Sequence, residues 1–202
     1  SYILARMTDP RLWSNSPDSD QLKRAVLSAN IKDLTQKTNF QAAYNNRYLF
    51  VKVNCAESMA EKMDFSSQKQ QRDSKKVFSA PNVEFFLDPD FTRKTAAHIV
   101  INVNGGVFDR LNGNANWNLP VESATLHDGK SWALYVAFPW KDRGMDNVFG
   151  MIPSANPLIG FNLCRNRVHG ATEISQWALT ANQTFLRPQE FGILVLTGEE
   201  KT

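Results

Sequence analysis

The segment 82–91, with the sequence NVEFFLDPDF, places a single carboxylate, Glu84, within a run of Val, Phe and Leu residues. A buried strand gains nothing from such a group, because an unpaired buried charge is costly. An exposed strand has equally little use for the three consecutive apolar residues 85–87. A carboxylate in this setting can accept hydrogen bonds from hydroxyl groups of a ligand, pair with a neighbouring Arg, or bind calcium. We interpret Glu84 as part of a ligand-binding face of a β-sandwich, with the other two roles left open.

The sequence lacks the usual signatures of catalysis. It contains no nucleophile elbow, no HExxH zinc motif and no phosphate-binding loop. Its carboxylates are spread out rather than recognisable as the acid/base pair of a glycosidase. Cys55 and Cys164 belong to no CxxC motif, and the three His residues do not stand at the spacing of metal ligands. We therefore expect a protein that is not an enzyme.

The composition indicates a soluble globular protein. Of the 202 residues, 42% are hydrophobic and 21% are charged, which suits a domain with a substantial core. The net charge of +3 does not indicate nucleic-acid binding, and we interpret the basic run 69–76 as a solvated loop rather than a polyanion contact. No apolar stretch of about 18 residues is available to span a membrane. No signal peptide is recognisable, so the compartment is not readable from the residues. We expect neither a nucleic-acid partner nor a membrane partner.

Strands must position these residues, because helical periodicity is almost absent. Short alternating or apolar runs recur between turn signals, which is typical of an all-β sandwich or barrel. The predicted strands are 23–30, 37–44, 47–54, 82–88, 97–104, 121–128, 131–140, 158–167 and 191–197. Long segments between them usually carry function or local structure. They are 56–80, 111–120, 141–157 and 168–190. No linker divides the chain, so we predict one domain over residues 1–202.

Seven segments, read in order, resemble the family 9 carbohydrate-binding modules. They are DPRLW (9–13), AAYNNRYLFVKV (42–53), NVEFFLDPD (82–90), HIVINVNGGVFD (98–109), WALYVAFPW (132–140), IGFNLCRNR (159–167) and FLRPQEFGILVL (185–196). Each combines hydrophobic alternation with a few fixed side chains, and they follow one another in the order that the family uses. The resemblance implies a jelly-roll-like sandwich of two antiparallel sheets with little helix. It also implies a non-catalytic domain that binds a polysaccharide or oligosaccharide.

The resemblance further implies a biological setting. Such modules usually belong to a larger secreted polysaccharide-degrading enzyme or surface protein. We therefore expect covalently linked catalytic or surface domains in the full-length protein, and a secreted, cell-surface or periplasmic location. Structural calcium often accompanies such modules, and no organic cofactor is expected. The carboxylates suited by type to calcium are Asp88, Asp90 and Asp109, although they lack EF-hand spacing.

The family's sugar site can be transferred position by position. A pyranose has an apolar C–H face and a belt of hydroxyls, so its site combines exposed rings with polar side chains. Phe78, six residues before Glu84, and Phe185, in the closing segment FLRPQEFG, stand where the family has two clamping Trp residues. These two Phe residues could instead anchor their loops against the core. The polar contacts of the family correspond here to Glu84, Asn102 and Asn182.

Two polar members of the family's site are replaced in this sequence. Val100 stands in place of a sugar-binding Arg, and Cys164, which we keep as a site position, stands in place of a Gln. The loss of a guanidinium fork and an amide removes much of the directional recognition. Because a site built for hydroxyl groups discriminates strongly, we expect the ligand to differ from that of the family's well-known members.

Three further residues are candidates for ligand contact. Arg165 and Arg167 share one strand face, where they could grip a carboxylate or sulfate of an acidic polysaccharide. They could equally pair with Glu173 or Asp109. Trp117 lies in the polar loop LNGNANWNLP with no evident core to enter, so it is a second candidate sugar platform. The other four Trp residues are expected in structural positions.

Two other functions stay open at the level of the sequence. A sandwich with a degenerate sugar site would serve a structural or protein-interaction role. Related sandwich domains bind haem through Met with His or Lys. Met145, Met151 and His98 supply such side chains, but their spacing matches no haem pattern. We expect Cys55 and Cys164 to be free thiols, with a disulfide as the alternative in an exported protein.

Overall fold

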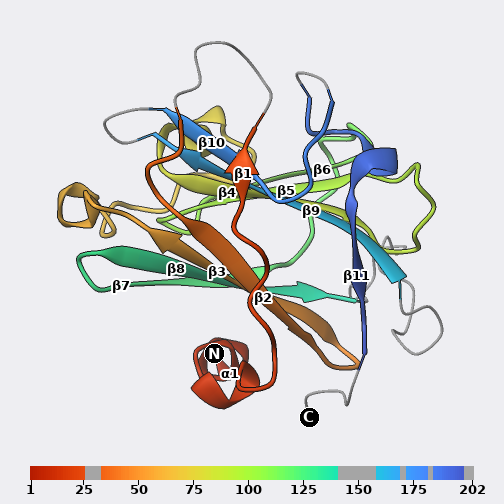
Figure 1. Cartoon of the computed structure of the whole chain (residues 1–202), viewed down its shortest axis with the longest axis horizontal. Helices are drawn as coiled ribbons and strands as arrows, with labels where there is room; N and C mark the ends of the chain where they lie inside the picture. The colour runs from red at the N-terminus through yellow and green to blue at the C-terminus, as the bar shows by residue number, and fades with distance from the viewer. Residues whose placement is uncertain (26–32, 141–157, 169–171, 182–183, 198–202) are drawn as a thin grey trace.

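The structure is a computed structural model that describes residues 1–25, 33–140, 158–168, 172–181 and 184–197 (Figure 1). Its strands are β1 (Lys23–Arg24), β2 (Thr38–Tyr44), β3 (Tyr48–Ala56), β4 (Asn82–Asp88), β5 (Ala97–Asn102), β6 (Val107–Leu111), β7 (Glu122–His127), β8 (Ser131–Pro139), β9 (Leu158–Arg167), β10 (Glu173–Gln176) and β11 (Gly192–Val195). Its helical segments are α1 (Tyr2–Met7) and the short 3-10 helices η1 (Pro10–Leu12), η2 (Ala60–Lys62), η3 (Lys75–Ser79) and η4 (Pro188–Glu190).

The strands form two antiparallel sheets that stack on one another (Figure 1). The large sheet has seven strands in the order β1-β10-β9-β4-β5-β6, and β11 also pairs with β9. The small sheet has the order β2-β3-β8-β7. The predicted all-β sandwich of two antiparallel sheets is therefore confirmed.

Most strand positions follow the sequence pattern. The predicted strands 82–88 and 158–167 coincide with β4 and β9 at both ends. Of the predicted strand 23–30, Lys23–Arg24 form β1, Ala25 is described but not in a strand, and residues 26–30 lie outside the described part of the chain. Two short strands, β6 and β10, were not predicted, because runs of five and four residues show little alternation.

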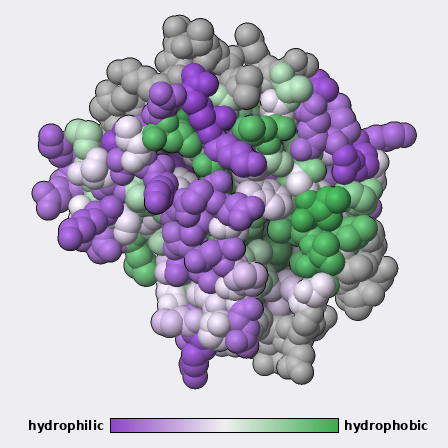
Figure 2. Space-filling view, viewed as in Figure 1, coloured by the Kyte–Doolittle hydropathy of each residue, from purple (hydrophilic) through white to green (hydrophobic). Residues whose placement is uncertain are grey.

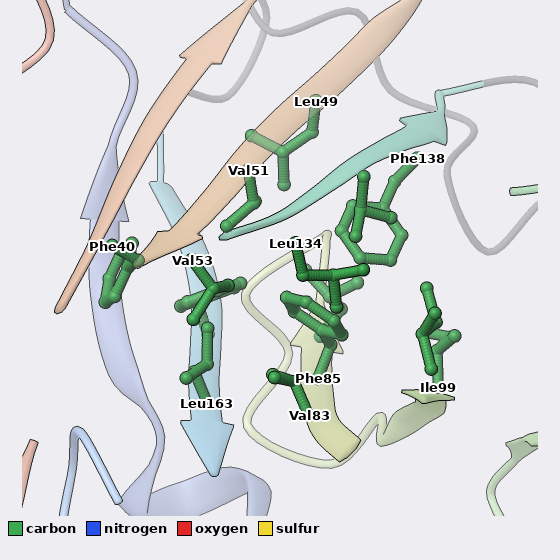
Figure 3. Packing of buried hydrophobic residues seen from close by; sticks show 14 of the residues in the cluster. Phe40, Leu49, Val51, Val53, Val83, Phe85, Ile99, Leu134, Phe138 and Leu163 are labelled. Atoms are coloured by element: carbon green, nitrogen blue, oxygen red, sulfur yellow. The ribbon is translucent and has the colours of Figure 1, made fainter. Parts of the chain in front are cut away.

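Alternate residues of the strands build the core between the sheets. In Figure 3, Val83 and Phe85 of β4 point toward Val53 and Phe138 of the small sheet, and the Phe85 and Phe138 ring centroids lie 5.1 Å apart. A fully buried side chain of this size contributes about 1.5–3 kcal/mol to the free energy of folding. Side chains alternate along a strand, so Glu84 and Phe86 of β4 must point to the opposite side from Val83 and Phe85. This side of the large sheet faces away from the small sheet, and we call it the outer face.

The outer face of the large sheet is also covered. All seven residues of β4, which lies between β9 and β5, are buried. Over the outer face, Val77 of η3 packs with Val100 and Phe108, and Phe191 packs with Phe86. This explains the unbroken apolar run 85–87, because β4 needs apolar side chains on both of its faces.

The N-terminal segment covers the other side of the sandwich. Met7, Leu12 and Trp13 pack against Phe50 and Tyr135 on the outer side of the small sheet, where Figure 1 shows α1. The Trp13 indole N–H donates to the carbonyl of Met7 over 2.9 Å, which fixes the turn between α1 and η1. Among the described residues, no helix has the length and apolar character needed to cross a bilayer.

Candidate functional site

The candidate site lies on the outer face of the large sheet, where cross-strand partners of Glu84 share its side of the sheet. Glu84 pairs in register with Val100 of β5 on one side and with Cys164 of β9 on the other. Val100 pairs in turn with Phe108 of β6. Val100 and Cys164, the two positions at which the resemblance implied replaced polar contacts, therefore flank Glu84 directly.

A row of aromatic rings crosses this face and joins the two predicted clamp positions. Phe78 lies 5.1 Å from Phe108 between ring centroids, and Phe108 lies 6.4 Å from His98. The His98 ring stacks on Phe86 at 4.5 Å, and Phe86 lies 5.9 Å from Phe185. We call these five rings the aromatic row. Phe78 and Phe185 are its two ends.

Each end of the row is held by a short 3-10 helix or the loop before one. Phe78 lies in η3, whose N-cap Ser74 accepts a hydrogen bond from the backbone N–H of Lys76 over 3.2 Å. Phe185 lies in the segment that leads into η4 and packs on Phe86. Both Phe side chains are partly buried, so each anchors its loop and still presents part of a ring to solvent.

Glu84 is held by two neighbours. Its side chain is largely buried, its Oε1 lies 2.7 Å from Nε2 of His98, and its Oε2 accepts from Nδ2 of Asn166 over 2.7 Å. The alternative of an Arg partner is therefore wrong, because a His takes that place. A carboxylate has about four lone-pair sites, so Glu84 retains acceptor capacity for hydroxyl groups.

His98 is a site residue that the site prediction did not include. It contacts Glu84 through its ring nitrogen and belongs to the aromatic row at the same time. The signal available in the sequence was its place two residues before Val100, which puts both side chains on one face of β5.

Cys164 lies beneath this surface rather than on it. It is fully buried and packs with Phe86, Ala96 and Phe191. Burial, and then the neighbouring Glu84, raise the pKa of the Cys164 thiol well above its usual value, so it stays protonated. Cys55 and Cys164 are both free, which confirms the thiol prediction.

Asn102 holds the backbone around Phe78 instead of reaching outward. Its Nδ2 donates to Oε1 of Gln70 over 2.7 Å and to the carbonyl of Val77 over 3.1 Å. Its Oδ1 accepts from the backbone N–H of Asn104 and of Gly106. Because Asn102 is fully buried and these bonds use its donor and acceptor, the structure gives it a positioning role and not a ligand contact. Asn182 lies outside the described residues.

The interpretation of Trp117 as an exposed platform is wrong. Its side chain is only 8% exposed and belongs to the main core, together with Leu119. The polar loop turns inward at Trp117 and Leu119, so both side chains enter the interior of the sandwich. The loop sequence alone gave no sign of this.

Arg165 is also not a ligand contact. Its side chain is 3% exposed, its Nη2 lies 3.1 Å from Oε2 of Glu57, and its Nη1 donates to Oγ1 of Thr38. Arg167 pairs with the other oxygen of Glu57 at 2.9 Å and with Glu173 at 3.1 Å. The pairing with Glu173 was predicted and the pairing with Glu57 was not. These two Arg residues join the sheets through a buried ion network and leave no free fork for an acidic ligand.

The carboxylates proposed for calcium are used within the chain. Asp88 accepts from the backbone N–H and hydroxyl of Thr92 and from the backbone N–H of Arg93. Asp109 pairs with Arg72 at 2.5 Å, and Asp90 is exposed. Within the described residues, no three His, Cys, Asp or Glu side chains gather as a metal site. Calcium binding stays a prediction from the family and gains no support from this arrangement.

The structure does not bring together the side chains named for haem binding within the described residues. Met145 and Met151 lie outside it, and the ring nitrogen Nε2 of His98 is engaged by Glu84.

A separate groove of about 1010 Å³ opens between the N-terminal segment, β2 and β11. Phe40, Tyr44 and Trp177 line it, and Figure 2 shows apolar side chains gathered over β11, where Ile193 and Val195 are exposed. It includes none of the predicted site residues.

Comparisons with known proteins agree with the fold. A family model described as "Carbohydrate family 9 binding domain-like" matches residues 4–199. Among curated proteins, none matches this sequence. A family 9 carbohydrate-binding module from Caldicellulosiruptor kristjanssonii in complex with cellotriose superposes with a TM-score of 0.63 at 14% identity, covering 93% of this chain and 86% of that one.

Two further solved structures show the same likeness. The C. kristjanssonii module in complex with glucose gives a TM-score of 0.63 at 14% identity, with 94% of this chain and 88% of that one covered. A protein from Bacteroides uniformis proposed to bind carbohydrate gives a TM-score of 0.64 at 15% identity, with 96% of this chain and 91% of that one covered. At such identities the structural likeness establishes the fold alone.

Proposed function

Because the chain belongs to the carbohydrate family 9 binding domain-like family, we propose that it binds a saccharide on the outer face of the large sheet without acting on it. The observation that carries this proposal is the aromatic row, which ends in Phe78 and Phe185 and runs beside Glu84. The solved relatives in complex with cellotriose and glucose support the same class of ligand.

The arrangement meets the two demands of sugar binding. The partly exposed rings of Phe78 and Phe185 offer apolar surface for the C–H faces of a pyranose. Glu84 offers charged acceptor sites for hydroxyl groups, and its two partners fix its orientation before a ligand arrives. Such preorganisation reduces the entropy lost on binding.

The arrangement does not suit glycoside hydrolysis. Along β4, the next carboxylate on the same face as Glu84 is Asp88, four residues away, which corresponds to about 13 Å in a strand. Glycosidases need two carboxyl groups about 5–9.5 Å apart. Asp88 is also occupied by three hydrogen bonds from Thr92 and Arg93.

On the same basis, the chain serves as a module of a larger secreted, cell-surface or periplasmic protein that degrades or retains polysaccharide. This part of the proposal rests on the family alone. Fractionation of the source organism with an antibody against residues 60–75 would test it, because detection at the size of this chain in the cytoplasm would contradict it.

A glycan array that includes neutral, uronic-acid and sulfated polymers tests the binding function. We expect retention on one class of polymer, with isothermal titration calorimetry giving a saturable affinity. The partial packing of Phe78 and Phe185, together with Val100 and Cys164 beside Glu84, favours a structural or protein-interaction role as the second candidate. If the protein binds none of the polymers, the structural or protein-interaction role is the function that remains.

A further inference from the structure

Arg110 places a guanidinium group on the same outer face. It lies in β6, where its cross-strand partner is His98, and its side chain therefore shares the face of the aromatic row. Its guanidinium carbon lies 4.8 Å from the centroid of the Phe108 ring. Phe108 also contacts Phe78, so Arg110 and Phe78 pack on the same ring.

The Arg110 guanidinium has a buried donor without a partner. Its Nε is buried and makes no hydrogen bond within the described chain, and Arg110 takes part in none of the ion pairs found there. By contrast, Arg72, Arg165 and Arg167 each pair with a carboxylate. Arg6 and Arg165 also have a buried Nε without a partner, so this atom alone does not single out Arg110. What distinguishes Arg110 is a partly exposed guanidinium on the face of the aromatic row that no carboxylate of the described residues engages.

Arg110 lies diagonally across from Val100, which flanks Glu84. The cross-strand partner of Val100 is Phe108, two residues before Arg110. A diagonal pair of this kind lies about 7–8 Å apart in an antiparallel sheet. The Arg110 guanidinium therefore lies one strand beyond Val100, on the Phe108 ring that Phe78 also contacts.

The surroundings of Arg110 favour an anion. Lys75 and Lys76, both exposed, lie in η3 next to Phe78. The nearby Asp73 accepts from the backbone N–H of Asp109, and Glu84 is held by His98 and Asn166. A planar guanidinium binds a carboxylate through two parallel hydrogen bonds, which gives both strength and direction.

We propose that Arg110 makes this site selective for acidic saccharides, by binding the carboxylate of a uronic-acid unit whose ring rests on Phe78. The inference rests on the proposed sugar-binding function and adds the class of ligand. Acid recognition, which the sequence suggested for Arg165 and Arg167, is thereby assigned to a different residue, because those two are committed to Glu57.

Matched ligands and variants test the role of the charge. Oligosaccharides of glucuronate, galacturonate, mannuronate and guluronate are titrated as free acids and as methyl esters, which differ in charge but not in ring stereochemistry. Arg110→Met keeps an apolar stem over Phe108 and removes the fork. Lys52→Met is the control, because Lys52 also lies over a ring, Tyr135 at 5.6 Å, on the small sheet.

We expect the wild type to bind at least one free acid roughly tenfold to hundredfold more tightly than its ester. Arg110→Met should abolish that preference, Lys52→Met should keep it, and Arg110→Lys should keep only part of it because Lys lacks the fork. The preference should also shrink as NaCl is raised. Thermal unfolding would establish that each variant is folded. If Arg110→Met does not fold, Arg110→Lys serves as the test.

The outcomes separate this inference from the function on which it rests. Equal affinity for acids and esters across the panel, or an acid preference that survives Arg110→Met, would overturn the role of Arg110 and leave saccharide binding intact. A wild type that binds no acid, ester or neutral oligosaccharide would overturn both.

Discussion

The Nε2 atom of His98 lies 2.7 Å from Oε1 of Glu84, while the His98 ring stacks on Phe86 at 4.5 Å. One side chain therefore joins the polar and the apolar parts of the candidate site. The position of the Glu84 carboxylate depends on the packing of the His98 ring on Phe86, so a change at His98 or at Glu84 should affect the other residue.

Glu84→Gln tests the carboxylate as a hydroxyl acceptor. A neutral amide accepts weaker hydrogen bonds than a carboxylate, so we expect affinity for the saccharide to fall by about tenfold or more. The free energy of unfolding should change little, because Gln can still bond to His98 and Asn166 once the imidazole changes tautomer. Calorimetric titration and urea unfolding measure the two effects, with the exposed Glu61→Gln as control. An unchanged affinity would remove Glu84 from the site.

His98→Phe separates the two roles of the imidazole. The variant keeps an aromatic ring in the row and removes the nitrogen that faces Glu84. We expect the free energy of unfolding to fall by about 1–3 kcal/mol, because a buried acceptor loses a partner. Saccharide affinity should fall as well, since Glu84 is no longer held in place. A variant that binds as tightly as wild type would show that His98 does not position the carboxylate.

Phe78→Ala and Phe185→Ala test the two ends of the aromatic row. Both rings are partly buried, so each change should cost clearly less than the about 3–5 kcal/mol expected for a fully buried ring such as Phe85. Binding to the saccharide should be lost in both variants. Phe85→Ala provides the comparison in urea unfolding. A stability loss as large as that of Phe85→Ala, with binding kept, would identify the two rings as loop anchors alone.

The fold could be predicted because its information is local. In β4, Val83, Phe85 and Leu87 alternate toward the core, and this period of two is visible in the sequence. The same alternation placed Glu84 on the other face. By contrast, α1 is six residues long, too short to show a helical period, and was not predicted.

The errors in the candidate site concern contacts that join distant segments. Arg167 and Glu173 are six positions apart across one hairpin, and that pair was among the predictions. Arg165 and Glu57 are 108 positions apart, and only the stacking of the two sheets brings them together. Trp117 reaches the core for a similar reason, because the path of its loop depends on the whole sandwich.

The two thiols should be inert in the folded protein. Burial raises the pKa of Cys55 to about 11 and that of Cys164 well above its usual value, and the reactive species is the thiolate. At about pH 8, Ellman's reagent should therefore react with neither thiol in the native state and with both after unfolding in urea. Rapid reaction of one native thiol would mean that its side chain opens to solvent.

Glu57→Gln tests the ion network that joins the sheets. Burial alone would raise the pKa of Glu57, but hydrogen bonds and charges from Arg167 and Arg165 outweigh it and lower that pKa from 4.5. Folding therefore favours the carboxylate, and its contribution to stability is present above about pH 4.5 and lost as the pH falls through the lower folded-state value.

At neutral pH we expect Glu57→Gln to lower the free energy of unfolding by about 3–5 kcal/mol, because two buried guanidinium groups lose their shared partner. Urea unfolding at several pH values measures both effects, with Glu61→Gln as the exposed control. As the pH falls below about 4.5, the wild type should lose stability more steeply than Glu57→Gln does. Parallel pH profiles for the two proteins would show that Glu57 does not contribute to stability as a paired carboxylate.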